Sequence, residues 1–385
     1  MRMKRILTLV SILCLLAVIP REAQAEALNI PAKSALLMDV ATGTVLYEKN
    51  AHEALAPASV TKVMTMLLIM EAIDSGSIHY DDIVTASEAA AAKGGSQIYL
   101  KAGEQMSVSE MLKSIAVSSA NDCACAMAEH LSGSESAFVD RMNTRAKELG
   151  MEDTHFVNCT GLDDGPDAES HKTSAYDIAL MSRELLGKHP DIQKYTTIWM
   201  DTVRNGAFGL SNTNKLIRFY PGATGLKTGF TSAAGYCLSA SAQREGLGLI
   251  AVTMGAESAK IRNAACKAML DYGFANFALV EPALEENAQV PVKLGKAPGV
   301  SAVLEGNQSL LIPKAKKSGL ETDIILLDSV TAPVAQGTPL GTLTLRSGDE
   351  TLLEAPLVAA QAVPRKSFGE IYIQVLKRAA MAKKA

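Results

Sequence analysis

A serine and a lysine three residues apart, in the segment Ser59-Val60-Thr61-Lys62, could do chemistry together. They stand at the start of an expected helix, where residues three apart share a face, so the amine can reach the hydroxyl. A serine hydroxyl is a poor nucleophile until a neighbouring base takes its proton, and a lysine can be that base where burial and nearby cations lower its pKa. Backbone N–H groups at the helix N-terminus also favour an oxyanion beside Ser59. This segment alone does not establish a catalytic pair, because an N-cap serine followed by a solvated lysine would have the same sequence.

The second segment is Ser119-Ala120-Asn121, which lies between two expected helices. A hydroxyl and an amide on one tight turn can relay a proton and hold a peptide carbonyl. The alternative is that Ser119 or Asn121 only caps the helix that follows.

The third segment is Lys227-Thr228-Gly229, on an expected strand. A lysine and a threonine at the start of an edge strand can hold a carboxylate and orient a peptide. Gly229 would let another backbone or a substrate approach closely. The alternative is a strand with an exposed lysine.

Together the three segments form a pattern. Ser-x-x-Lys, Ser-x-Asn and Lys-Thr-Gly follow one another with gaps of about 60 and 105 residues. This order resembles the signature of the penicillin-recognising serine enzymes, which include the penicillin-binding proteins and the class A β-lactamases.

The resemblance narrows to low-molecular-mass penicillin-binding proteins that are D-alanyl-D-alanine carboxypeptidases of the peptidase S11 type. The segments that resemble this group are Phe156–Leu162, His171–Ala179 and Asn212–Leu216, with a small β domain and a basic tail after them. Phe230 and Thr213 stand where some relatives have His and Arg.

This resemblance implies a role for each motif residue. Ser59 would attack the carbonyl between the two terminal D-alanines of a peptidoglycan stem peptide, and Lys62 would take its proton. Ser119 would complete the catalytic set and, with Lys227, protonate the leaving D-alanine. The implied substrate-binding residues are Asn121, Lys227, Thr228 and Gly229, with Thr228 on the terminal carboxylate and Asn121 on a substrate amide. β-Lactam antibiotics would be covalent inhibitors, and the resemblance implies no metal or organic cofactor.

Two alternatives belong to other functional classes. A class A β-lactamase would carry a Glu-x-x-Leu-Asn segment between the second and third motifs to activate water. Glu184-Leu-Leu-Gly-Lys lacks the Leu-Asn and falls in an expected helix. A non-catalytic wall-binding protein would have lost Ser59 or Lys62, and both are present.

The periodicity of the chain predicts the elements that must position these motifs. Residues 34–48 favour a β-hairpin. The further expected elements are helices over 60–75, 107–117, 121–131, 134–149 and 173–186, strands over 225–230, 236–243 and 247–254, and a helix over 257–277. The order predicts an α+β fold in which helices pack on an antiparallel sheet whose strands come from both ends of the domain. It resembles the β-lactamase and DD-peptidase fold.

Length and composition set the outer limits. The chain has 385 residues, which fits two domains, and its 48% hydrophobic and 20% charged residues exclude global disorder. A net charge of −4 leaves no basic excess for nucleic acid. After the N-terminus no apolar run is long enough to cross a membrane. The expected segments are an export signal over 1–25, a catalytic domain over 26–278, a small all-β domain over 279–362 and an amphipathic helix over 363–385.

The N-terminal segment has the pattern of a signal peptide. Positive charges in residues 1–5 precede the apolar run Ile6–Pro20 and the small-residue site Ala23-Gln24-Ala25. We expect cleavage after Ala25, and the alternative is an uncleaved anchor. Export would place the protein in the cell wall, at the outer face of the cytoplasmic membrane.

The C-terminal segment predicts a basic amphipathic helix. Its apolar residues recur at helical spacing and are Phe368, Ile371, Tyr372, Val375, Leu376 and Ala379. Its six positive charges, Arg365, Lys366, Lys377, Arg378, Lys383 and Lys384, oppose Glu370 alone. Such a helix favours attachment in the plane of a membrane surface, and the alternatives are packing on the β domain or fraying.

The cysteines predict no metal site. Five remain after the expected cleavage: Cys123, Cys125, Cys159, Cys237 and Cys266. None has zinc-ligand spacing, so we expect buried thiols, with one disulfide as the alternative outside the cytoplasm.

Overall fold

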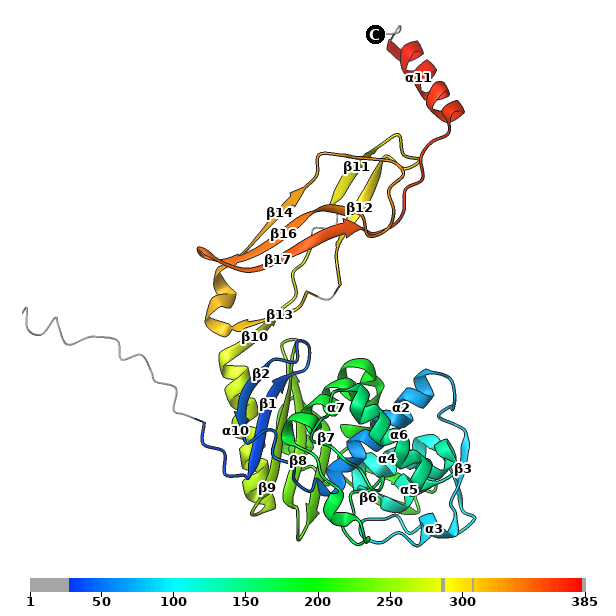
Figure 1. Cartoon of the computed structure of the whole chain (residues 1–385), viewed down its shortest axis with the longest axis vertical. Coiled ribbons are helices and arrows are strands. Elements are labelled where there is room, and N and C mark those ends of the chain that lie inside the picture. The colour runs from blue at the N-terminus through cyan, green and yellow to red at the C-terminus, as the bar shows by residue number, and fades with distance from the viewer. Residues whose placement is uncertain (1–27, 285–287, 307, 383–385) are drawn as a thin grey trace, which may run out of the picture. The chain divides into compact units, whose positions relative to one another are not determined.

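The structure is a computed structural model that describes residues 28–284, 288–306 and 308–382 (Figure 1). The expected export signal lies outside these residues.

A five-stranded antiparallel sheet, in the order β2-β1-β9-β8-β7, forms the frame of the catalytic domain. The strands are β1 (Ser34–Asp39), β2 (Val45–Lys49), β7 (Ala223–Thr231), β8 (Gly235–Arg244) and β9 (Leu247–Ala256). Because β1 pairs with β9, the N-terminal hairpin joins the three late strands, which confirms the predicted fold class. The strand of the Lys-Thr-Gly motif, β7, is at the edge of the sheet.

Helices cover both faces of this sheet (Figure 1). One face carries α10 (Ala259–Asn276) and the other carries α7 (Ala175–Lys188), behind which the remaining helices gather. These are α2 (Lys62–Asp74), α4 (Val108–Ser118), α5 (Asn121–Ser132) and α6 (Glu135–Glu148). A serine stands at the N-cap of each of the helices α4, α6, α7 and α10, and its hydroxyl accepts a backbone hydrogen bond.

The sequence of the central helix α2 is apolar on all sides because the helix is buried on all sides. Every residue from Lys62 to Met70 is buried, so this helix has no solvent face along that stretch. The turn before it, η1 (Ala58–Thr61), is a 3₁₀ turn and not the α-helix that the periodicity predicts. This difference matters for the position of Ser59.

Several short elements carry no clear periodicity and were not predicted. They are β3 (Ile83–Thr85), α3 (Glu88–Ala91), β4 (Gln105–Ser107), η2 (Ala168–Ser170), η3 (Pro190–Ile192), α8 (Gln193–Thr196), β5 (Met200–Val203), β6 (Phe208–Ser211) and α9 (Leu216–Phe219).

The C-terminal part contains the predicted all-β region, a six-stranded sheet in the order β14-β16-β17-β12-β11-β15. Its strands are β11 (Gln289–Lys293), β12 (Gly299–Leu304), β14 (Leu320–Leu326), β15 (Val330–Thr331), β16 (Pro339–Ser347) and β17 (Glu350–Ala359). Beside it, β10 (Phe277–Val280) pairs with β13 (Leu310–Pro313), which η4 (Lys314–Gly319) follows. The expected boundary at residue 278 falls inside β10.

The chain continues into α11 (Phe368–Ala382), which begins later than the segment expected from residue 363. Val363 pairs with Val334 and is buried in the core of the β domain. Within the described residues no helix is long and apolar enough to span a bilayer.

The five cysteines predicted to be buried thiols are all buried and free.

Candidate active site

The structure brings Ser59 and Lys62 into contact. The Lys62 amine lies 2.9 Å from the Ser59 hydroxyl oxygen and donates to the Thr160 carbonyl at 2.8 Å. Lys62 has no exposed surface, so the alternative of a solvated lysine is wrong. Burial lowers the pKa of Lys62 to about 7, although Cys159 and Asp122 act to raise it. A large share of such amines is neutral near pH 7 and can accept a proton.

The 3₁₀ turn is the local reason for this contact. In a 3₁₀ helix residues three apart are eclipsed, so the side chains of Ser59 and Lys62 lie directly over one another. Ala58, just before the serine, has a φ of 48°, a left-handed conformation that is uncommon outside glycine. The turn is therefore held by its surroundings.

Two glycines from distant parts of the chain pack closely against this turn. A Cβ on Gly161, whose φ is +81°, would lie 1.8 Å from the Ala58 carbonyl oxygen. A Cβ on Gly229 would lie 2.7 Å from the Pro57 carbonyl oxygen and 3.0 Å from the Ser59 nitrogen. Only glycine allows both approaches, so the close approach expected of Gly229 is made by strand β7 to the serine turn.

Ser119 and Asn121 lie where α4 ends and α5 begins, and neither is the N-cap of α5. Ser119 is the C-cap of α4, at a φ of 65°, and Asn121 is the first residue of α5, whose N-cap, Ala120, makes no side-chain capping bond. The Asn121 amide nitrogen donates to the Gly94 carbonyl at 2.7 Å. The Ser119 hydroxyl and the Asn121 carbonyl oxygen are buried and have no hydrogen-bond partner among the described residues.

Buried polar atoms without partners cost about 1–3 kcal/mol each, so their presence needs a reason. A substrate that supplies a donor to Asn121 and a polar atom to Ser119 would remove that cost. The two atoms therefore mark a place for a polar ligand.

The Lys-Thr-Gly strand is buried here, which excludes the alternative of an exposed lysine. Lys227 is 1% exposed, and burial, with the positive charges of Lys62 and Arg262, lowers its pKa well below the usual range. Its amine donates to the Thr228 carbonyl at 2.9 Å. The Thr228 hydroxyl donates to the Thr213 hydroxyl at 2.7 Å. Lys62 and Lys227 thus act on each other electrostatically, across two motifs far apart in sequence.

Sequence reasoning missed the residues that hold Lys62 from the other side. The side-chain oxygen of Asn158, Oδ1, accepts hydrogen bonds from the backbone N–H groups of Thr160 and Gly161 at 3.1 and 2.6 Å and folds residues 158–162 into a tight loop. This loop presents the Thr160 carbonyl to the lysine. Residues 156–162 were recognised as family-like, but no spacing rule gives a backbone carbonyl a role.

His171 was also part of a recognised segment without a role. The Thr61 hydroxyl donates to the Ala58 carbonyl, so it accepts from His171 Nε2 at 2.8 Å, and Nδ1 accepts from the Val157 N–H at 3.1 Å. Burial, with His155 and Lys62, lowers the pKa of His171 to about 4. The ring is neutral near pH 7 and buttresses the serine turn without adding a charge beside Lys62.

Arg262 on α10 is a third omission. It is buried, and its position on the same helix face as Cys266 was the available signal. Its guanidinium donates to the Cys237 carbonyl at 3.5 Å, and its charge acts on Lys227.

Glu184, the only glutamate that sequence analysis weighed as a water activator, serves another purpose. Its carboxylate accepts from Arg145 at 2.7 Å. Within the described part of the chain no group of three His, Cys, Asp or Glu side chains could hold a metal ion.

Comparison with known proteins agrees with this geometry. The D-alanyl-D-alanine carboxypeptidase family, peptidase S11, matches residues 21–258, and the C-terminal domain of penicillin-binding protein 5 matches residues 282–365. The D-alanyl-D-alanine carboxypeptidase DacF of Bacillus subtilis is 46% identical over 90% of this chain and 88% of its own length. DacA of Escherichia coli is 34% identical over 91% of this chain and 88% of its own.

Solved structures give the same result. Penicillin-binding protein 5 from Haemophilus influenzae has a TM-score of 0.72 at 30% identity and covers 88% of this chain and 98% of its own. Penicillin-binding protein D2 from Listeria monocytogenes, in an ampicillin-bound form, has a TM-score of 0.56 at 32% identity and covers 64% of this chain and 99% of its own.

Proposed function

This chain belongs to the peptidase S11 family of D-alanyl-D-alanine carboxypeptidases, and we propose that Ser59, Lys62 and Ser119 carry out its reaction. It is a serine-type hydrolase of peptidoglycan peptides ending in D-Ala-D-Ala and a target of penicillin. The observation that carries the assignment of roles is the buried amine of Lys62, 2.9 Å from the Ser59 oxygen.

Acylation begins with attack of the Ser59 oxygen on the carbonyl carbon of the penultimate D-alanine. The hydroxyl proton passes to the neutral Lys62 amine, and negative charge collects on the carbonyl oxygen. The Ser59 backbone N–H is one donor available to that oxygen, beside the strand at Gly229. When the carbon–nitrogen bond breaks, the proton that Lys62 took passes through Ser119 and Lys227 to the leaving amine. Lys62 is then neutral again, and the acyl group stays on Ser59 as an ester.

Deacylation repeats these steps with water. Lys62 takes a proton from the water that attacks the ester, and the proton returns to the Ser59 oxygen as the shortened peptide leaves. In the acylation step, before the terminal D-alanine leaves, Thr228 holds the carboxylate of that residue, with Lys227 as the counter-charge. Asn121 holds a substrate amide through the carbonyl oxygen that has no partner in the protein.

Mass spectrometry of the intact protein after mixing with penicillin tests the assignment. We expect one drug mass on the peptide that contains Ser59, retained for minutes or longer, and none in Ser59→Ala. Release of D-alanine from a pentapeptide should accompany it. Rapid drug turnover without an adduct would favour the β-lactamase alternative, and loss of both activities would favour the wall-binding alternative.

We also propose that the protein is exported and attaches to the outer face of the cytoplasmic membrane through α11. In support, the large apolar side chains Phe368, Tyr372, Val375 and Leu376 are exposed, Phe368 by 84%. An exposed apolar stripe on a basic helix fits the boundary between headgroups and acyl chains of an anionic bilayer.

A further inference from the structure

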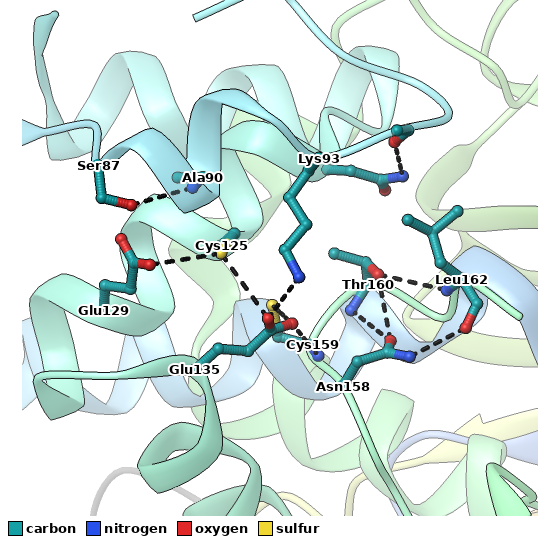
Figure 2. Close-up of polar contacts among 12 residues, drawn as sticks. Ser87, Ala90, Lys93, Cys125, Glu129, Glu135, Asn158, Cys159, Thr160 and Leu162 are labelled. Atoms are coloured by element: carbon teal, nitrogen blue, oxygen red, sulfur yellow. Dashed lines mark hydrogen bonds and ion pairs between the residues drawn. The ribbon is translucent and has the colours of Figure 1, made fainter. Parts of the chain in front are cut away.

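An ion pair that the catalytic motifs do not include lies next to the active site. The Lys93 amine contacts Glu135 Oε2 at 2.5 Å, and the two side chains are 25% and 21% exposed. Lys93 follows helix α3, and Glu135 is the first residue of α6. Figure 2 shows the Lys93 amine and the sulfurs of Cys125 and Cys159 gathered around the Glu135 carboxylate.

The other oxygen of this carboxylate holds Cys159. Glu135 Oε1 accepts from the Cys159 thiol at 3.2 Å and from the Cys159 backbone N–H at 3.3 Å. The Cys125 thiol is a weaker neighbour of Oε2, at 3.9 Å. Burial acts to raise the pKa of Glu135, but the hydrogen bond and charge of Lys93 and the bonds from Cys159 hold it below its usual value. The carboxylate is therefore charged and receives donors at both oxygens.

Cys159 is next in sequence to the residue whose carbonyl accepts a hydrogen bond from Lys62. Its own carbonyl accepts from the Thr65 hydroxyl of α2 at 2.7 Å, and the carbonyl of the next residue, Thr160, accepts from the Lys62 amine at 2.8 Å. The backbone at Cys159 is thus fixed by Glu135 on its N–H side and by α2 on its carbonyl side. A shift at Glu135 would move the acceptor that aims Lys62 at Ser59.

Lys93, the other partner of the ion pair, is next in sequence to a residue that contacts the Ser119–Asn121 motif. Lys93 precedes Gly94, whose carbonyl accepts from the Asn121 amide at 2.7 Å. The Lys93–Glu135 contact therefore joins the segment that holds Asn121 to the loop that holds Lys62. Figure 2 shows both sides together, with the Asn158, Thr160 and Leu162 loop beside the ion pair.

We propose that Lys93 and Glu135 are a positioning pair, which fixes the Cys159–Thr160 backbone so that the Thr160 carbonyl orients the Lys62 amine toward Ser59. This inference rests on the proposed role of Lys62 as the base. Neither Lys93 nor Glu135 contacts the reacting atoms.

Glu135→Gln is the sharpest test. An amide has one accepting end and one donating end, whereas this site presents donors at both ends, so glutamine cannot satisfy Lys93 and Cys159 together. We expect acylation of Ser59 by radiolabelled penicillin to slow by about ten- to a hundredfold, as it does when a catalytic group is misplaced. Noncovalent binding of penicillin before acylation should change little.

The pH profile separates positioning from a loss of stability. A carbonyl acceptor favours the ammonium form of Lys62, so a displaced Thr160 carbonyl lowers the pKa of that lysine. We expect the acid limb of the acylation profile in Glu135→Gln to move to lower pH while its plateau falls. Lys93→Met should behave in the same way, and Lys93→Arg, which keeps the charge, should recover most of the rate.

Glu184→Gln is the matched control. It breaks an Arg145–Glu184 contact of 2.7 Å between side chains that are 21% and 26% exposed, and neither side chain is hydrogen-bonded to the 158–162 loop. We expect a similar change in melting temperature and an acylation rate and pH limb like those of the unaltered protein. If Glu135→Gln does not fold, Lys93→Met supports the same comparison, since it removes only the amine that anchors the Glu135 carboxylate.

A Lys62→Ala background separates this inference from the proposed function. If Lys62→Ala acylates normally, the role of the base is wrong and the positioning role is overturned with it. If Lys62→Ala is slow but folded Glu135→Gln or Lys93→Met acylates at the normal rate, only the positioning role is overturned. We expect Glu135→Gln to slow the otherwise unaltered protein and to add nothing once Lys62 is absent; an equal slowing in both backgrounds also overturns the proposal.

Discussion

At the scale of single residues, the central feature is a buried lysine whose pKa is lowered to about 7. Lys62 has no exposed surface, and its lowered pKa follows first from that burial. The carbonyl of Thr160 and the hydroxyl of Ser59 are its hydrogen-bond partners, and neither carries a charge that would hold the proton on the amine. A base and a nucleophile are thereby placed in contact before substrate binds.

Lys62→Ala should nearly abolish acylation while the protein stays folded. A missing general base costs about 10²–10⁴ in rate, and more if the same lysine serves deacylation. Removal of a buried amine also relieves a desolvation cost, so the fold should tolerate the change. Penicillin labelling measures the rate and circular dichroism checks the fold. Near-normal labelling of the folded variant would transfer the role of base to Ser119 or Lys227.

The rate of acylation should rise with pH through about 7 and then level off. Only the neutral amine can take the Ser59 proton, and the pKa of Lys62 is about 7, so acid protonates the base and slows the reaction. The second-order rate constant for penicillin acylation, measured from about pH 5.5 to 8.5, reports this titration in the free enzyme. A flat profile over that range would contradict the assignment.

At the scale of elements, the site depends on how closely strand β7 and the 158–162 loop approach the turn η1. The expected helix start at Ser59 is a 3₁₀ turn with a left-handed residue before it. On each of the two neighbouring segments, the residue that contacts this turn is a glycine. Periodicity predicted α2 and β7 as elements. It could not predict the distance between them, because that distance depends on a side chain that is absent.

Gly229→Ala should slow acylation by about tenfold or more without unfolding the domain. The added methyl group would lie 2.7 Å from the Pro57 carbonyl and 3.0 Å from the Ser59 nitrogen, so β7 or the serine turn must shift. Gly209→Ala on β6 is the control, because a Cβ there meets no atom within 4 Å. Equal labelling rates for both variants would show that the close approach has no catalytic role.

At the scale of the whole molecule, the chain combines a catalytic domain with a β domain and a basic amphipathic helix. Residues 363–366 belong with the β domain by their contacts, since Val363 pairs with Val334 and Lys366 N–H donates to the Leu294 carbonyl. The proposed membrane attachment is therefore assigned to α11 alone, and removal of α11 leaves these contacts of the β domain in place.

A chain that ends at Lys366 should keep its activity on soluble peptides and lose sedimentation with anionic vesicles. The removed segment, residues 367–385, carries an exposed apolar stripe and four of the six basic residues of the tail, each of which contributes about 1 kcal/mol near an anionic surface. Binding of the full chain should also weaken at high salt. Undiminished sedimentation of the shortened chain would rule out attachment through α11.

The sequence by itself determined the fold class and the three motifs, because both depend on residues that are close together in the chain. Helix and strand periodicities mark the elements, and the three-residue spacing of Ser59 and Lys62 puts the two side chains on one face. The family resemblance then supplied roles that no single motif could support.

Only the tertiary structure decided which of these residues are buried and what else touches them. Thr160 is 98 residues from Lys62, and Glu135 reaches it through Cys159, so neither contact has a signature in local spacing. The pKa of Lys62 and the unpartnered atoms of Ser119 and Asn121 follow from the same packing. Desolvation is produced by whatever surrounds a group in space, and those surroundings come from segments that meet only when the chain folds.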